Sequence, residues 1–145
     1  MTIKHLARRF ATSLSRQPPS QDDEGWAEGW LLRSEIELWR RMPNADRRHA
    51  VVVARRFLDR RPAADRTEVA GALLHDVGKV EARLGTFGRV VATVVGPRTE
   101  RFRTYYDHEA IGARLAAAAG SDGVTVALIE GRGGAAEDLR SADQV

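Results

Sequence analysis

The sequence predicts an all-α protein with about seven short helices. Apolar side chains recur at spacings of three and four residues along most of the chain, which is the period of an amphipathic helix. Several of these stretches follow residues that commonly begin helices. Residues 85–96 could form a helix or a strand, but no other stretch offers them a strand partner. With 145 residues, 43% of them hydrophobic and 30% charged, the chain has the length and composition of one folded domain with a single core.

The composition excludes several kinds of function. The chain has no Cys, so disulfide frameworks, thiolate metal sites and Cys nucleophiles are ruled out. A metal site would therefore have to use His, Asp and Glu side chains. No apolar run approaches the roughly 18–20 residues that a membrane-spanning helix needs. We expect a cytoplasmic protein without a membrane span.

The positive charge is concentrated in the first half of the chain. The pI of about 9.9 is high because Lys4 and Lys79 are the only lysines among 23 basic residues, the others being arginines, yet the net charge is only +3. Residues 1–61 carry 13 basic and 8 acidic side chains, whereas residues 62–145 carry 10 and 12. A nucleic acid is therefore not the expected partner, because the overall field is weak.

Residues 1–21 are predicted to form a basic N-terminal segment that ends in a Pro-rich linker, and residues 22–145 the helical domain. The first 16 residues contain four basic and no acidic side chains, with apolar residues at helical spacing. A targeting peptide or an interfacial helix has this pattern, and so does a short amphipathic helix that packs on the domain. A secretory signal is not expected, because a continuous apolar core is missing. Pro18 and Pro19 mark the linker.

The first helix of the domain is expected over residues 22–42. Three acidic residues lie in its first turn, where they favour a helix N-terminus, and three tryptophans and an isoleucine follow at helix-compatible spacings. These residues are Asp22, Asp23, Glu24, Trp26, Trp30, Ile36 and Trp39. We interpret the aromatic stripe as core packing, with a base-stacking platform as the alternative. The same helix offers a surface for a homodimer.

Six further segments have helical patterns. They cover residues 43–60, 65–77, 85–96, 107–120, 124–130 and 135–144. Asp65 followed by Glu68 predicts a capping box at the start of the second of these helices. Segment 85–96 is rich in valine and ambiguous between helix and strand, and we assign it as helix.

The stretch LLHDVGK, residues 73–79, carries the clearest chemical signal. It places His75 and Asp76 near the end of an apolar helix, where an unpaired carboxylate is costly and favours a nearby cation. Adjacent helix positions diverge by about 100°, so both would reach one ion only in a groove that other segments complete. Imidazole and carboxylate suit Mn, Fe, Co, Ni or Zn better than Ca. Gly78 is expected to end the helix tightly, and Lys79 to lie beside the site, where its ammonium meets a phosphate.

The order of four residues resembles the HD-domain metal-dependent phosphohydrolases. His49, the pair His75-Asp76 and Asp143 follow that family's H…HD…D order. The sequence LHDVGK, residues 74–79, is similar to the family's HDIGK form, with a valine in place of the isoleucine.

Two more segments are similar to the same family, so that the resemblance covers about residues 40–145. The sequence DHEAIGA, residues 107–113, resembles the start of the helix whose His supplies a second-metal ligand in two-metal members. The sequence LRSAD, residues 139–143, resembles the helix that carries the last aspartate.

The resemblance implies a compact bundle of about five to seven helices that hydrolyses a small phosphorylated, nucleotide-like substrate. One divalent cation (Mn, Fe, Mg, Co, Ni or Zn) would activate water for attack on phosphorus. Its ligands would be His49, His75, Asp76 and Asp143. Asp76 and Lys79 would be catalytic, with Lys79 holding a phosphate oxygen, and His108 would bind a second metal or contact the phosphate.

One departure from the family pattern speaks against a complete two-metal site. Two-metal relatives usually have another His just after the helix that corresponds to residues 124–130. This chain has Gly131-Arg132-Gly133-Gly134 there. Arg132 is a candidate substitute as a phosphate contact, because a guanidinium offers a planar fork of donors.

Three functions follow from these observations. The first is a phosphohydrolase with metal-activated water. The second is a regulatory or binding module that keeps the metal but has little or no turnover, which the missing His favours. The third is an adaptor that binds nucleic acid or a membrane surface through residues 1–16, and its low net charge argues against it.

Overall fold

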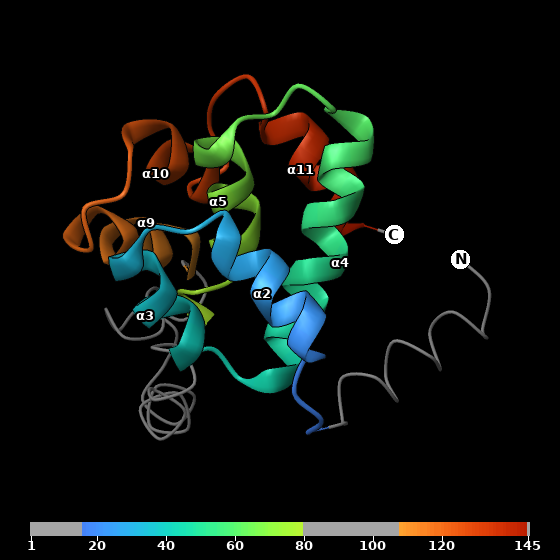
Figure 1. Ribbon diagram of the computed structural model, residues 1–145. Coiled ribbons are helices and arrows are strands. Elements are labelled where there is room, and N and C mark those ends of the chain that lie inside the picture. The colour runs from blue at the N-terminus through green and yellow to red at the C-terminus, as the bar shows by residue number, and fades with distance from the viewer. Residues whose placement is uncertain (1–15, 80–107, 145) are drawn as a thin grey trace, which may run out of the picture.

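The computed structural model describes residues 16–79 and 108–144, and these residues form seven α-helices and no strand (Figure 1). The all-α prediction is confirmed for this part of the chain. The helices are α2 (Gln21–Gly29), α3 (Arg33–Arg41), α4 (Asn44–Arg60), α5 (Arg66–Leu74), α9 (His108–Ala118), α10 (Gly123–Ile129) and α11 (Ala136–Asp143).

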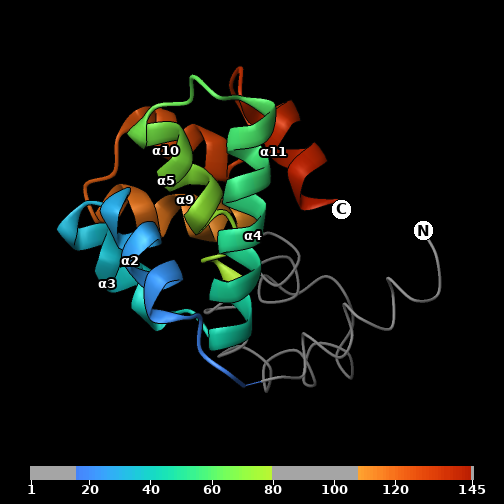
Figure 2. The same ribbon diagram turned by 45° about the vertical axis from the view of Figure 1, so that its right-hand side comes forward.

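Helix α5 lies at the centre of the bundle. Its residues from Val69 to Leu74 are all buried, because this helix is apolar on every side. It packs between α4 and α10, and Figure 2 shows α4 and α11 on one side of it and α10 on the other. Helix α11 packs against α4, and α9 packs against α10. The turn that follows α5 is therefore surrounded by other helices.

The start of α5 follows the predicted capping box. Asp65 Oδ1 accepts a hydrogen bond of 3.1 Å from the Glu68 backbone N–H, and Glu68 Oε1 accepts one of 3.4 Å from the Asp65 N–H. These two reciprocal bonds satisfy backbone donors that a helix start otherwise leaves unpaired.

The expected single helix over residues 22–42 is wrong, because the chain turns between α2 and α3. Leu32 has extended backbone angles and begins the second helix. Its N–H donates a 2.7 Å hydrogen bond to Glu35 Oε1. The Glu35 carboxylate is fully buried and also binds the Arg66 guanidinium at 3.1 Å and the Ser121 hydroxyl at 2.6 Å. These tertiary partners fix the break, which helical spacing alone does not reveal.

The aromatic stripe belongs to the core, as predicted. Trp39 is fully buried, and Trp26 and Trp30 are partly buried against the core cluster with their rings edge to face at 6.2 Å. The Arg55 guanidinium lies 4.7 Å from the Trp26 ring centroid, which is a cation–π contact.

Helices α4, α10 and α11 match the predicted segments to within one residue at each end. Helix α5 is shorter than predicted, because it ends at Leu74. Gly120, with φ of +85°, follows the end of α9, as predicted. The predictions for residues 1–15, segment 85–96 and the Asp107 cap lie outside the described residues. None of the described helices combines the length and the apolar character that crossing a bilayer requires.

Candidate metal centre

The structure brings three of the four predicted ligands together. His49 lies in α4, His75 in the turn after α5, and Asp143 is the last residue of α11. One ligand atom of each lies within 4.8 Å of the other two. His49 Nε2 is 2.8 Å and His75 Nε2 is 3.4 Å from the same oxygen, Asp143 Oδ1. Two imidazoles and a carboxylate from distant parts of the chain therefore face one point.

Helix packing explains how Asp143 reaches His49 across 94 residues of sequence. Leu139 and Ala142 are buried and hold α11 against α4. The His49 side chain is 35% exposed and that of Asp143 is 41% exposed. Solvent therefore reaches this side of the cluster.

His75 is the buried member of the cluster. Its Nδ1 lies 2.7 Å from the carbonyl oxygen of Ala72, which can only accept, so Nδ1 carries a proton and Nε2 is the nitrogen that is free to bind an ion when the ring is neutral. Its Nε2 is buried without a hydrogen bond. A buried polar atom without a hydrogen bond is rare in folded proteins, and an unprotonated imidazole nitrogen is chemically suited to bind a metal ion.

The charges around the cluster shift two pKa values. Burial acts to lower the pKa of His75, but the carboxylates of Asp143 and Asp76, each with an oxygen 3.4 Å from Nε2, outweigh it and raise this pKa above its ordinary value. The imidazoles of His49 and His75 hold the pKa of Asp143 well below its usual range. The cluster is thus an electron-rich site that favours positive charge, which a proton or a divalent cation supplies.

Asp76 lies beside the three-residue cluster rather than within it. The buried Asp76 carboxylate has Oδ2 at 3.4 Å from His75 Nε2 and at 3.2 Å from Lys79 Nζ. Its Oδ1 is 3.9 Å from His108 Nε2. The remaining predicted residues, Lys79 and His108, are therefore both next to Asp76.

A tight turn places His75 and Asp76 at this point. The sequence predicted that the pair lies near the end of the helix. Because α5 ends at Leu74, the pair instead lies in the turn that follows the helix. Gly78 permits the close approach of α9: a Cβ at this position would lie 1.8 Å from the carbonyl oxygen of His108. Gly78 was expected to end the helix. It instead leaves room for the backbone of His108, so that His108 can lie near Asp76.

The cluster opens into a small pocket of about 80 Å³ between α5, α9, α10 and α11. Its polar lining residues are His75, Asp76, His108, Glu109, Arg140 and Asp143. Sequence reasoning did not single out Glu109 or Arg140. Arg140 precedes Asp143 by three residues on α11, so the helical spacing from the predicted ligand was the available signal.

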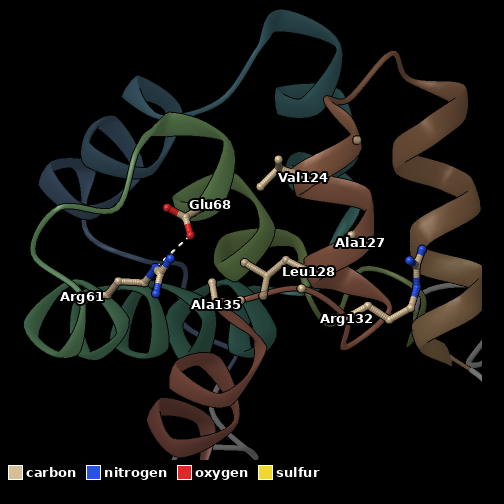
Figure 3. A pocket seen from close by; sticks show the side chains of 10 residues that line it. Arg61, Glu68, Val124, Ala127, Leu128, Arg132 and Ala135 are labelled. Carbon is tan, nitrogen blue, oxygen red and sulfur yellow. Dashed lines mark hydrogen bonds and ion pairs between the residues drawn. The ribbon is translucent and has the colours of Figure 1, made fainter.

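Arg132 points to a different part of the surface. It forms an ion pair with Glu130 and lines a second pocket, of about 250 Å³, together with Arg61 and Glu68. Figure 3 shows the Arg61–Glu68 ion pair at one side of that pocket and Arg132 at the other. The structure therefore does not bring Arg132 to the His–Asp cluster.

No family model, curated protein or solved structure matches this chain.

Proposed function

We propose that this protein is a metal-dependent phosphohydrolase that cleaves a phosphoester. The observation that carries the proposal is the buried Nε2 of His75, which makes no hydrogen bond, lies 3.4 Å from Asp143 Oδ1 and belongs to one cluster with His49. The H…HD…D order that resembles the HD-domain family supports it from the sequence side.

The donor set fits a divalent transition-metal cation. His49, His75 and Asp143 would hold the ion, and Asp76 would join them from its position beside His75. Two imidazoles with carboxylates suit Mn, Fe, Co, Ni or Zn, and Mg would be bound more weakly, since it prefers oxygen ligands. Such a cation would lower the pKa of water and polarise a phosphoester oxygen.

The residues around the cluster supply the rest of the chemistry. In the hydrolysis, a water oxygen bonds to phosphorus, the ester P–O bond breaks, and the leaving oxygen receives a proton. Asp76 is the candidate to accept the proton of the attacking water, because it is buried and next to the cluster. The Lys79 ammonium is paired with Asp76 at 3.2 Å and is 42% exposed, so it can bind a phosphate oxygen. His108, next to Asp76, is a second candidate contact.

A metal-binding module without turnover is the second candidate. The absence of His from residues 131–134 and the position of Arg132 at Glu130 both favour it.

The deciding experiment combines metal analysis with an activity assay. Protein that is purified without exposure to a chelator is analysed for bound metals by mass spectrometry. Hydrolysis of an aryl phosphate is then measured with added Mn²⁺, Co²⁺ or Ni²⁺. We expect bound metal in the wild type and a loss of about a hundredfold in rate for Asp76→Ala. Asp59→Ala, which removes an exposed carboxylate from α4, is the matched control. Bound metal with equal rates for wild type and Asp76→Ala would favour the module, and no bound metal would overturn both candidates.

A further inference from the structure

Arg140 lies at the pocket into which the His–Asp cluster opens. It is one helical turn before Asp143 on α11, so both side chains come from the same face of the helix. Of the described residues that line this pocket, only Arg140 carries a permanent positive charge. The pocket exceeds the roughly 10–15 Å³ that one water molecule requires, so it has room for a small polar group.

The Arg140 guanidinium is held loosely. Its Nη1 donates to the Gly131 carbonyl oxygen at 3.3 Å, and its Nη2 is 3.6 Å from Glu137 Oε2. Both distances are long, and the side chain is 58% exposed. A surface ion pair of this kind contributes little free energy, so the guanidinium can exchange these contacts for a stronger anion.

The charges of the pocket make a cation at this position necessary for anion binding. Asp76, Asp143 and Glu109 all line the pocket and repel a phosphate. Glu109 also approaches Gly131, the residue that Arg140 contacts: a Cβ on this glycine would lie 3.3 Å from Glu109 Oε2. A positive partner on the α11 side would therefore favour binding of a phosphorylated substrate, in addition to Lys79 beside Asp76.

We propose that Arg140 binds the phosphoryl group of the substrate and selects phosphomonoesters, an inference that rests on the proposed function. The guanidinium fork pairs with two phosphoryl oxygens, and a third oxygen then faces the His49–His75–Asp143 cluster. A phosphomonoester has three non-bridging oxygens to satisfy both partners, whereas a phosphodiester has two. The contact that the sequence assigned to Arg132 thus falls to Arg140.

Inorganic phosphate is the probe for this inference. Its binding to the Mn²⁺-loaded protein is measured by isothermal titration calorimetry for wild type, Arg140→Gln and Arg140→Lys. We expect Arg140→Gln to raise the dissociation constant roughly tenfold or more, with Mn²⁺ content and circular dichroism unchanged. Arg140→Lys keeps the charge but loses the planar fork, so its constant should fall between the two. Arg132→Gln is the matched comparison, since it removes an arginine of similar exposure, 65% against 58% for Arg140, that lines the other pocket.

Turnover of p-nitrophenyl phosphate and bis(p-nitrophenyl) phosphate then tests the substrate class. We expect Arg140→Gln to raise KM for the monoester more than it lowers kcat, and the wild type to prefer the monoester. Equal phosphate affinity in wild type and Arg140→Gln, or loss of affinity in Arg132→Gln instead, would overturn the inference and leave the proposed function standing. A wild type that prefers the diester would also overturn the inference and leave the proposed function standing. A wild type that binds no metal overturns the proposed function, and this inference with it.

Discussion

Asp143 is the residue on which the candidate centre depends most, because both imidazoles face its Oδ1. Replacing it by Asn keeps the shape and removes the negative charge. We expect Asp143→Asn to weaken Mn²⁺ or Zn²⁺ binding by about a hundredfold or more, since the loss of a residue that only supports a ligand already costs about 10–100-fold. Metal titration in a competition assay measures this. Asp138→Asn on the same helix is the control, because Asp138 pairs with Arg60 and Arg61 instead. Equal weakening in both variants would count against a direct role for Asp143.

The pKa shifts predict how the metal-free protein responds to pH. The raised pKa of His75 means that its protonated ring stabilises the fold fully below about pH 6.5, and that this stabilisation is lost as the pH rises through the folded-state pKa. The lowered pKa of Asp143 contributes stability that is lost only as the pH falls below about 4. We therefore expect thermal denaturation of metal-free protein at a lower temperature at pH 8 than at pH 6.

Metal binding is expected to show the opposite trend over the same pH range. Ligation requires neutral imidazoles, so the affinity for the cation should rise from pH 6 to pH 8 with release of protons. Asp143→Asn should reduce the change in Tm of the metal-free protein between pH 6 and pH 8, because it removes the charge that favours protonated His75. A Tm that rises with pH in the metal-free wild type would contradict the assignment.

At the residue scale, the sequence predicted the cluster better than its surroundings. His49, His75 and Asp143 could be predicted because their order in the chain resembles one family, and the structure brings their ligand atoms together. The sequence did not show that Arg132 lies away from the cluster, because the path of the chain between α10 and α11 takes it to the other pocket. Arg140 could have been found from its spacing of three residues from Asp143 on one helix.

Among the elements, the contact between the turn after α5 and α9 has the strictest steric requirement. Gly78→Ala would place a Cβ against backbone atoms of His108 and Gly112, which cannot move independently of α9. We expect a destabilisation of about 1–3 kcal/mol, together with weaker metal binding as His108 and Asp76 separate. Chemical denaturation and metal titration measure the two effects.

Gly25→Ala supplies the control for this substitution. A Cβ there meets nothing within 4 Å, and the residue lies inside α2. Alanine should stabilise the helix by about 0.5–1 kcal/mol. If both variants changed stability alike, the steric role of Gly78 would be disproved.

The elements themselves were largely predictable, and the exceptions share one cause. Periodicity and caps predicted α4, α10 and α11 closely, because those signals are local. The break between α2 and α3 depends on Glu35, whose partners Arg66 and Ser121 come from later parts of the chain. The turn after α5 likewise packs against α9, whose His108 and Gly112 backbone atoms lie close to Gly78. Long-range contacts override local pattern at both places.

At the scale of the whole molecule, the cluster connects two helices and a turn that are distant in sequence. A cation bound by His49, His75 and Asp143 would tie α4, the turn after α5 and α11 together. A ligand that binds only the folded state stabilises it by about 2.7 kcal/mol at a hundred times its Kd. For a domain of this size we expect a rise in Tm on the order of 10 °C with saturating Mn²⁺ or Co²⁺, which a chelator reverses. Differential scanning fluorimetry measures the shift, and an unchanged Tm at saturating metal would speak against the centre.

The all-α class could be predicted from periodicity, whereas the central position of α5 could not. Complete burial of Val69 to Leu74 is compatible with several arrangements of neighbouring helices. In the structure, α5 packs between α4 and α10. The turn after its C-terminal end lies near His108 of α9 and Asp143 of α11.

The two sides of the cluster differ in how freely their atoms move. The Ala72 carbonyl fixes the orientation of the buried His75 ring. The entropy cost of ordering His75 Nε2 is therefore part of folding and does not oppose ion binding. His49 and Asp143 border the solvent. Exchange of an ion should therefore proceed from their side without opening the core. Occupancy would then follow the free concentration of the cation in the surroundings, and the protein would gain or lose its ion within its folded lifetime.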